Sequence, residues 1–370
     1  MSKRNEIGQA MVANRRKFVK TMGISASAAL CGFTGIGSGV SDEVEIVTHK
    51  KGDKPVITKT VPAAWWNHTQ EAKKVKSIVR SNYLNKSYVK STGLSSHDKY
   101  YGGKRGFQIK VEVTSNEAKE NIPDQQNGIP INTEVSEEST LTASCHGGLN
   151  FDTLPGGVVV DEKATTGSQF YVDLDGDGYY TESLLTCLHT FGDKCNSHIG
   201  TVVEQYEDEW GKVESQSSSN DIALSQPYSG YDVDNGIFED DDNFIRVQGY
   251  VTEAGILDFD SENKTIYKTG RSTGTVSGYI SVSKRGSSGC TDYGEEGIKC
   301  DMNQAGGDSG GPIYDRRSGG DEAYMVGYGV AALDFTGNYA CNTAKIYANT
   351  LGPSAYHIAD VFNGQFTAPI

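Results

Sequence analysis

The sequence predicts an all-β domain over residues 141–370, preceded by a small α+β module with a polar linker over residues 41–140. Two observations predict the β domain. From about residue 141 onward the chain consists of short β-like runs separated by Gly, Ser, Asp and Asn, and in that part only SAYHIADVF, at 354–362, has helical periodicity. Strands that follow one another without intervening helices favour a barrel or a sandwich over alternating βαβ units.

Residues 1–40 have the features of a targeting segment. NRRKFVK, at residues 14–20, precedes a stretch at 21–35 that is too short and too rich in glycine for a membrane span. Paired arginines followed by Phe and Lys resemble a twin-arginine export signal. We therefore expect a secreted protein without a stable membrane anchor, and a basic helical arm is the alternative interpretation.

The module at 41–140 combines helices with strands. Asn67 and Gln70 form a capping-box pattern that opens a helix with apolar residues at helical spacing. Thr114 and Glu117 predict the cap of a short second helix. Two alternating segments predict strands, namely FQIKVEV at 107–113 and IPINTEV at 129–135.

Charge is unevenly distributed along the chain. The whole sequence carries a net charge of −14, whereas residues 141–370 hold 13 basic and 34 acidic side chains, a net −21. Such an acidic domain repels nucleic acid and anionic membranes, and the charge keeps it soluble. We therefore expect a monomer that does not bind nucleic acid.

Cysteine use indicates an oxidising compartment. Six of the seven cysteines lie beyond the expected signal, and none has the C-x-x-C spacing of a zinc site. An even set of cysteines in an exported chain predicts disulfides. The sequence by itself leaves their pairing open.

Three polar residues suit nucleophilic catalysis. Ser309 lies within GGDSGGP, where glycines surround one acid and one serine. A serine becomes a nucleophile when a base removes its proton and a buried acid holds that base in one tautomer. His189 ends the apolar run LLTCLH, and Asp221 begins the apolar run in NDIALSQP. His189, Asp221 and Ser309 are therefore the candidate catalytic triad.

The order His, Asp, Ser on an all-β chain resembles the chymotrypsin-like serine peptidases, and among them the bacterial streptogrisin and α-lytic type. The matching motifs are LTCLH, NDIAL, GDSGGPIY, SAYHIADVF and KTGRSTGTVSGYI, the last at 268–280. The resemblance implies a double antiparallel β-barrel with a C-terminal helix, a pro-like or accessory role for the 41–140 module, and hydrolysis of peptide bonds in proteins or peptides. It also implies that His189 is general base and then acid, that Asp221 orients it, and that Ser309 attacks the scissile carbonyl.

The same resemblance assigns roles to the residues around the serine. It implies that the N–H groups of Gly307 and Ser309 form an oxyanion hole. Asp308 needs a cationic partner in the barrel interior, because an unpaired buried charge costs several kcal/mol. The candidates for this partner are Lys268 and Arg271.

The resemblance also predicts disulfides and a specificity pocket. Cys187 takes the place of a small residue two positions before the histidine, so we expect a local bridge from Cys187 to Cys195. Cys300 and Cys341 flank the serine loop and are the candidates for a second bridge. Candidate residues of the primary specificity pocket are Asn303, Gln304 and residues 330–332.

No cofactor is expected, and a structural calcium ion is the alternative. Asp173, Asp175 and Asp177 have the spacing of a calcium loop, but Leu184 stands at the twelfth position, where a bidentate Glu is needed. The Asp-Gly pairs of this segment more simply close a hairpin. For the whole chain, the alternative to a peptidase is a catalytically inactive or accessory protein-binding module on the same fold.

Overall fold

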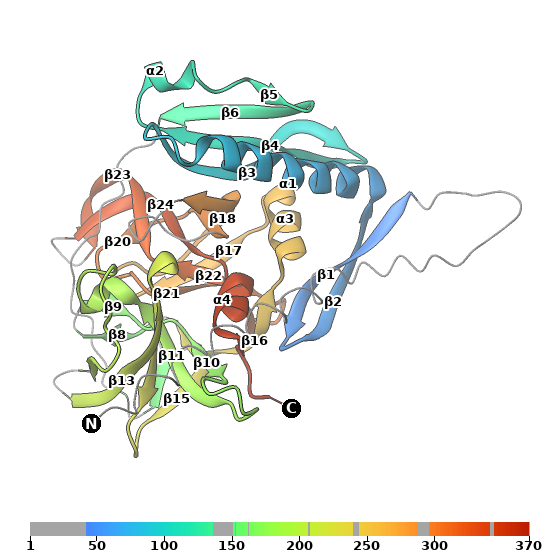
Figure 1. Cartoon of the computed structure of the whole chain (residues 1–370). Helices are drawn as coiled ribbons and strands as arrows, with labels where there is room; N and C mark the ends of the chain where they lie inside the picture. Colours follow the sequence, from blue (N-terminus) through green and yellow to red (C-terminus); the bar gives the residue numbers. More distant parts are fainter. Residues whose placement is uncertain are drawn as a thin grey trace, which may run out of the picture. The chain divides into compact units, whose positions relative to one another are not determined.

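The structure of the chain is a computed structural model (Figure 1). It describes residues 42–135, 151, 153–161, 163–205, 208–239, 244–287, 296–340 and 344–369. The expected export signal at 1–40 and Cys341 lie outside the described residues.

Antiparallel strands of residues 159–227 form the first β-barrel, with one strand added from the C-terminus. They are β8 (Val159–Val160), β9 (Ala164–Thr165), β10 (Gln169–Val172), β11 (Thr181–Cys187), β12 (Val202–Gln205), β13 (Asp208–Ser217), β14 (Ile222–Pro227) and β25 (Gly364–Gln365). The main sheet has the order β12-β13-β14-β11-β10-β25. The β8–β9 ribbon closes it, because the N–H of Asp161 donates to Glu204 at 2.8 Å and the N–H of Gly167 donates to Leu185 at 2.6 Å.

The second β-barrel follows later in the chain. Its strands are β17 (Ile266–Gly270), β18 (Gly274–Ser287), β19 (Gly297–Asp301), β20 (Gln304–Ala305), β21 (Gly311–Arg316), β22 (Glu322–Gly329), β23 (Ala331–Ala340) and β24 (Ala344–Pro353). Antiparallel pairing runs from β22 through β21, β17, β18 and β19 to β24. A bridge between Gly327 of β22 and Ser354, directly after β24, closes this circle.

Three further strands and a helix join the two barrels. The strands are β7 (Thr153–Gly156), β15 (Asp232–Phe238) and β16 (Phe244–Val251); β15 pairs with β7 and β16, and β16 pairs with β22. The helix α4 (Ala355–Phe362) buries Ile358 and Phe362 in the same apolar cluster as Phe170 of β10. The predicted all-β fold with two barrels and a C-terminal helix is confirmed.

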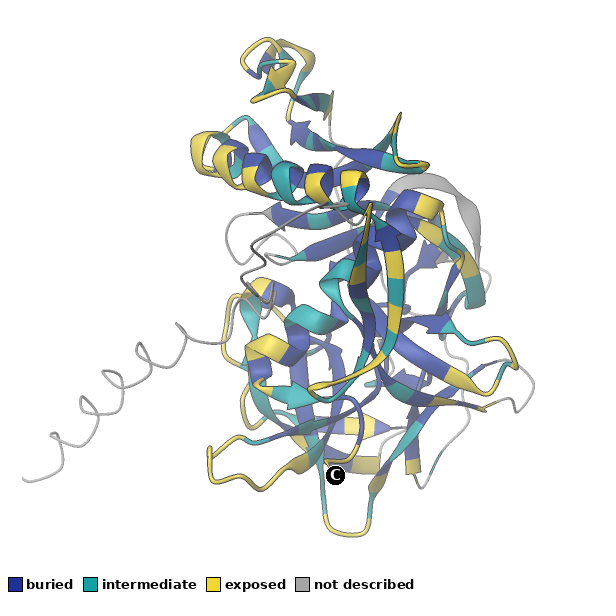
Figure 2. Cartoon of the chain, turned by 90° about the vertical axis from the view of Figure 1, so that its right-hand side faces the viewer, coloured by how far each residue is buried: buried dark blue, intermediate teal, exposed yellow. Residues whose placement is uncertain are grey.

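Helices and strands also alternate in the N-terminal module, as predicted. Its elements are β1 (Glu43–Lys51), β2 (Lys54–Pro62), α1 (Ala63–Tyr83), β3 (Val89–Tyr101), β4 (Lys104–Val113), α2 (Asn116–Lys119), β5 (Gln125–Gln126) and β6 (Ile129–Val135). Figure 2 shows α1 with buried residues on one face and exposed residues on the other. No helix among the described residues is long and apolar enough to cross a membrane.

The two predicted helix caps of the module were wrong. Helix α1 begins at Ala63, four residues before Asn67, because Pro62 supplies a fixed φ of −58° at the helix entrance. Ser115 caps α2 in place of Thr114, since its hydroxyl accepts the N–H of Ala118 at 3.4 Å. The short capping motifs therefore located these helices without fixing their first residues.

A helix that the sequence did not predict lies between the two β-barrels in the chain. Helix α3 (Glu253–Glu262) begins at Thr252, whose hydroxyl accepts the N–H of Gly255 at 3.1 Å. It ends at Asn263 in the left-handed conformation. Most of its residues are buried, including polar ones, so it has no simple apolar stripe.

The module pairs through strands with β16, which joins the two barrels, and with β18 of the second barrel. His49 and Lys50 of β1 pair antiparallel with Val251 and Tyr250 of β16. The far end of β18 pairs with β3, with Ser283 opposite Leu94. Hydrogen-bonded strands therefore connect the two expected parts of the chain, the 41–140 module and the 141–370 domain.

Candidate active site

His189 and Asp221 are brought together by two neighbouring strands. β11 and β14 pair antiparallel, with Cys187 opposite Ile222, so the end of one strand lies beside the start of the other. His189 follows β11 in a short 3-10 helix, Leu188–Phe191. Asp221 precedes β14 in the left-handed region, with φ of 53°, a conformation that Asp tolerates better than most residues.

The two side chains make a charge-assisted hydrogen bond. Nδ1 of His189 lies 2.6 Å from Oδ2 of Asp221, and the backbone N–H of His189 donates to Oδ1 at 2.9 Å. Asp221 is fully buried, and the His189 side chain is 14% exposed. Burial lowers the pKa of His189, but the sulfur of Cys187 and the carboxylate of Asp221 together raise it well above its ordinary value.

Ser309 is buried in the loop between β20 and β21, beside the histidine strand. Its carbonyl accepts the N–H of Thr165 at 2.8 Å. Gly310 packs against β11 so closely that a Cβ there would lie 2.7 Å from the Thr186 hydroxyl and 3.0 Å from the Cys187 nitrogen. With φ of 91°, Gly310 also adopts a conformation that favours glycine. The glycine after Ser309 therefore permits the close approach of the serine loop to the strand that carries His189.

Nε2 of His189 faces a cysteine in this structure. It lies 3.7 Å from Sγ of Cys187, whose other polar neighbour is the Thr190 hydroxyl at 2.9 Å. Between the described side chains of His189 and Ser309 there is no hydrogen bond. The structure thus brings His189 and Asp221 into contact and Ser309 into the same region, without a serine–histidine hydrogen bond.

Of the backbone N–H groups of residues 307–311, two have no main-chain acceptor among the described residues. Those of Asp308, Gly310 and Gly311 donate to the carbonyls of Ala305, Gly329 and Asp308 respectively. Those of Gly307 and Ser309 donate to no described carbonyl. Gly307 has φ of 89°, which favours glycine. These are the two groups that the sequence predicted for an oxyanion hole.

Asp308 is bound to Lys268 in the barrel interior. Nζ of Lys268 lies 2.7 Å from Oδ2 of Asp308, and both side chains are fully buried. The carboxylate also accepts the Thr273 hydroxyl at 2.7 Å and the N–H groups of Ser272 at 2.8 Å and Ala305 at 3.0 Å. The buried charge is thus fully compensated.

Arg271, the other predicted partner of Asp308, lies beside the serine loop. Its Nε would be 2.4 Å from a Cβ at Gly307. Ser272 and Thr165, which also contact the loop, were missed in the sequence. Ser272 directly follows Arg271 in the KTGRST segment, but Thr165 belongs to no motif, and only the fold brings it to Ser309.

The two predicted disulfide pairings were wrong. Cys187 and Cys300 are both buried and free, whereas Cys195 is disulfide-bonded. Cys187 instead turns its sulfur toward His189 and Thr190. The bonded partner of Cys195 is therefore neither Cys187 nor Cys300.

The acidic segment at 173–178 closes a hairpin. β10 and β11 pair antiparallel up to Val172 and Thr181, on either side of it. The carboxylate of Asp173 accepts the N–H groups of Gly176 at 2.7 Å and Gly178 at 3.0 Å. The described residues, Asp175 and Asp177 among them, contain no group of three or more His, Cys, Asp or Glu side chains that could hold a metal ion.

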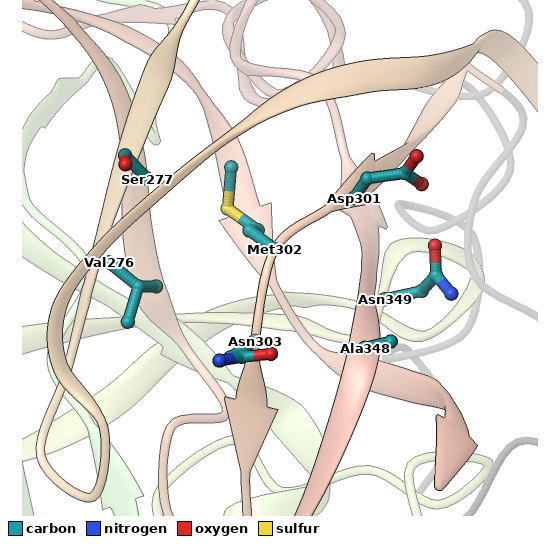
Figure 3. Close-up of a pocket in the computed structure, with 7 residues that line it drawn as sticks. All are labelled: Val276, Ser277, Asp301, Met302, Asn303, Ala348 and Asn349. Atoms are coloured by element: carbon teal, nitrogen blue, oxygen red, sulfur yellow. The ribbon is translucent and has the colours of Figure 1, made fainter. Parts of the chain in front are cut away.

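A cavity of about 370 Å³ lies next to the segment that leads to Ser309. Its lining residues, drawn in Figure 3, come from β18, from the end of β19 with the two residues that follow it, and from β24. Of the predicted specificity residues, Asn303 lines this cavity, whereas Gln304 and residues 330–332 are not among its lining residues. The lining residues are Val276, Ser277, Asp301, Met302, Asn303, Ala348 and Asn349.

No protein-family model and no curated protein matches the sequence. Several solved protease structures are similar to it. Nocardiopsis protease is 19% identical with a TM-score of 0.41, covering 58% of this chain and 98% of that one. Thermobifida fusca protease A is 20% identical with a TM-score of 0.41, covering 58% and 97%. Cellulomonas bogoriensis chymotrypsin is 16% identical with a TM-score of 0.40, covering 59% and 100%.

Proposed function

We propose that the protein is an exported serine endopeptidase that hydrolyses peptide bonds through an acyl-enzyme intermediate. The observation that carries the proposal is the 2.6 Å hydrogen bond between His189 and the buried Asp221, with Ser309 in a glycine-rich loop packed on the same strand end. A buried acid that holds an imidazole in one tautomer beside a serine is the arrangement that makes a serine nucleophilic.

The first chemical step forms a bond between Ser309 Oγ and the carbonyl carbon of the substrate. Nε2 of His189 accepts the Oγ proton as the bond forms, and the electron pair of the carbonyl moves to its oxygen. A rotation of the imidazole away from Cys187 brings Nε2 to the hydroxyl; catalytic hydrogen bonds are often long before substrate binds. The N–H groups of Gly307 and Ser309 stabilise the oxyanion.

The second step breaks the carbon–nitrogen bond. The oxyanion electrons return to the carbonyl, and the imidazolium of His189 gives its proton to the leaving amine. Water then attacks the acyl-enzyme with His189 as base again, which releases the acid and restores the Ser309 hydroxyl. Asp221 stabilises the imidazolium in both halves of the cycle, in keeping with the raised pKa of His189.

We further propose that the 41–140 module is a folding aid and inhibitor that is removed when the enzyme matures. Pairing of β3 with β18 and of β1 with β16 supports this role, because it offers a template to one strand of the second barrel and to one strand that joins the two barrels. The proposal includes twin-arginine export, a secreted monomer, and protein or peptide substrates. Mass spectrometry of the secreted protein tests it; a fully active product that begins near residue 41 contradicts removal of the module.

A fluorophosphonate probe separates the peptidase from an inactive binding module on the same fold. Such a probe labels a serine that a base has activated, so we expect it to label Ser309 in the wild type. Ser309→Ala loses the label and hydrolysis while its thermal unfolding stays unchanged, since one hydroxyl is removed. Absence of labelling in the wild type, or Ser309→Ala activity within tenfold of wild type, contradicts the proposed function.

A further inference from the structure

The direction of each oxyanion-hole N–H is set by the peptide to which it belongs. In a trans peptide the N–H of one residue points opposite to the C=O of the residue before it. The Ser309 N–H is thus fixed by the carbonyl of Asp308, which accepts a main-chain hydrogen bond from Gly311 at 2.9 Å. The Gly307 N–H is fixed by the carbonyl of Gly306.

A side chain holds the carbonyl of Gly306. Ser272, in the loop between β17 and β18, donates its hydroxyl to this oxygen and is 8% exposed. Gly306 and Gly307 have no Cβ, so the peptide between them meets the least steric resistance to rotation. The Ser272 hydroxyl therefore restrains the rotation of this peptide, which the two glycines by themselves do not restrain.

A second hydroxyl acts one peptide further along the chain. Oγ1 of Thr165, in β9, donates to the carbonyl of Gly307 at 2.6 Å and accepts the N–H of Arg271 at 3.1 Å. The backbone N–H of Thr165 also donates to the carbonyl of Ser309 at 2.8 Å. Thr165 is fully buried, so these contacts do not compete with water. One residue of the first barrel thus holds the serine segment on both sides of Asp308.

We propose that Ser272 and Thr165 are positioning residues that orient the Gly307 N–H toward the oxyanion, an inference that rests on the proposed function. Neither hydroxyl acts on the substrate. They act through the planes of the two peptides between Gly306 and Asp308. Loss of the Ser272 hydroxyl frees the peptide that carries the Gly307 N–H. Loss of the Thr165 hydroxyl frees the following peptide, and so removes the restraint on the other side of Gly307. Either change lets the Gly307 N–H turn away from the developing charge. Such a change weakens transition-state binding more than substrate binding, and therefore lowers kcat more than it raises KM.

The test uses pairs of variants that remove or keep each hydroxyl. Ser272→Ala and Thr165→Val remove it, and Ser272→Thr and Thr165→Ser keep it. Ser281→Ala is the matched control, because it removes a hydroxyl that donates to the Lys299 carbonyl at 3.3 Å elsewhere in the second barrel. Each variant of the secreted protein is measured for kcat and KM on a peptide amide, and for inhibition by a peptide aldehyde, whose adduct with Ser309 carries an oxyanion.

We expect Ser272→Ala and Thr165→Val to lower kcat about tenfold or more, with KM within about twofold, because loss of a whole oxyanion donor costs roughly 10²–10³ in kcat. Aldehyde inhibition weakens by a similar factor. The hydroxyl-keeping variants and Ser281→Ala stay near wild type.

Two results overturn the inference. One is kcat and aldehyde inhibition in Ser272→Ala within about twofold of wild type. The other is a fall in kcat that is as large in Ser272→Thr and Thr165→Ser as in Ser272→Ala and Thr165→Val, and that is proportional to the loss of thermal stability. Fluorophosphonate labelling of the wild type separates the two proposals: a labelled wild type with unaffected Ser272→Ala overturns the positioning role alone, whereas an unlabelled wild type overturns the proposed function and this inference with it.

Discussion

The ammonium of Lys268 lies 2.7 Å from the carboxylate of Asp308, and neither side chain is exposed to solvent. Lys268 precedes the loop that carries Ser272, and Asp308 precedes Ser309. The ion pair therefore ties the loop that holds the Gly306 carbonyl to the loop that carries the serine. Both partners lie within the described chain, so the contact does not require a newly formed N-terminus.

Lys268→Met is expected to destabilise the serine loop and to lower activity. It leaves Asp308 as a buried charge without its cation, and breaking a buried pair in this way costs roughly 3–5 kcal/mol. Adding Asp308→Asn removes the uncompensated charge and should restore part of the stability. Urea unfolding and kcat/KM of the two variants check this. Wild-type stability and activity in Lys268→Met contradict the assignment.

Cys187→Ala is expected to move the acid limb of kcat/KM to lower pH. Catalysis needs the neutral imidazole, so activity rises with pH through the pKa of His189. Burial lowers this pKa, but Cys187 and Asp221 raise it above the ordinary value, and the variant removes one of the two raising influences. Cys300→Ala, which removes the other buried free cysteine, is the control and should leave the limb in place. Coincident profiles for Cys187→Ala and wild type contradict the prediction.

Arg285→Met should weaken the junction between the module and the second barrel. Nη2 of Arg285, in β18, lies 2.7 Å from Oε2 of Glu112, in β4, and both side chains are buried. Burial raises the pKa of Glu112, but Arg285 and the Ser91 hydroxyl lower it to about 2. The variant leaves Glu112 charged and without its cation, at a cost of roughly 3–5 kcal/mol. The double variant with Glu112→Gln should recover part of this.

The same pair has a defined pH dependence. The pKa of Glu112 is lower in the folded chain than in the unfolded chain, where it is about 4.3. The contribution of Glu112 to the free energy of unfolding is therefore present above about pH 4.3 and is lost as the pH falls toward 2. Urea midpoints across this range should fall more steeply for wild type than for the double variant. Equal slopes contradict a role for this pair.

The sequence motif around Ser309 predicted the residues whose backbone conformation requires a particular residue type, in this case glycine. Gly307 and Gly310 have φ of 89° and 91°, so the glycines of GGDSGGP are required by the backbone around Ser309. Thr165 could not be found this way. Its contacts with Gly307 and Ser309 join residues more than 140 positions apart, and only the closure of the two barrels brings them together.

Helix α3 was missed because its polar residues point into the protein. Oδ1 of Asp258 is bound by Lys104 at 2.6 Å, and Oδ1 of Asp260 accepts the N–H of Ser96 at 3.2 Å. Lys104 and Ser96 belong to the module, so these buried carboxyl groups have hydrogen-bond partners outside the helix. Apolar residues of α3, Ile256, Leu257 and Phe259, are buried next to these polar ones, so burial does not follow a single apolar stripe and a periodicity search cannot detect such a helix.

Asp260→Asn is expected to stabilise the protein near pH 8 and to change little near pH 4. Asp260 is fully buried, and burial raises its pKa to about 7, although the hydrogen bonds of Ser96 and Ser283 oppose the shift. The folded chain therefore keeps a proton that the unfolded chain loses above about pH 4. Stability falls as the pH rises from there to about 7 and is constant above it. A gap of about three pH units corresponds to roughly 4 kcal/mol.

The variant removes this dependence and keeps the acceptor for the Ser96 N–H, because the Asn amide oxygen replaces Oδ1. Urea unfolding at pH 4, 6 and 8 compares it with wild type, and the other titrating groups cancel in the difference. Ser261→Ala, which removes the hydroxyl that donates to the Asp258 carbonyl at 2.8 Å in the same helix, is the control and should shift stability equally at all three values. The opposite result is a difference in the free energy of unfolding between wild type and Asp260→Asn that is the same at pH 4 and pH 8. It would show that Asp260 is ionised throughout, with its charge compensated by the groups packed around α3.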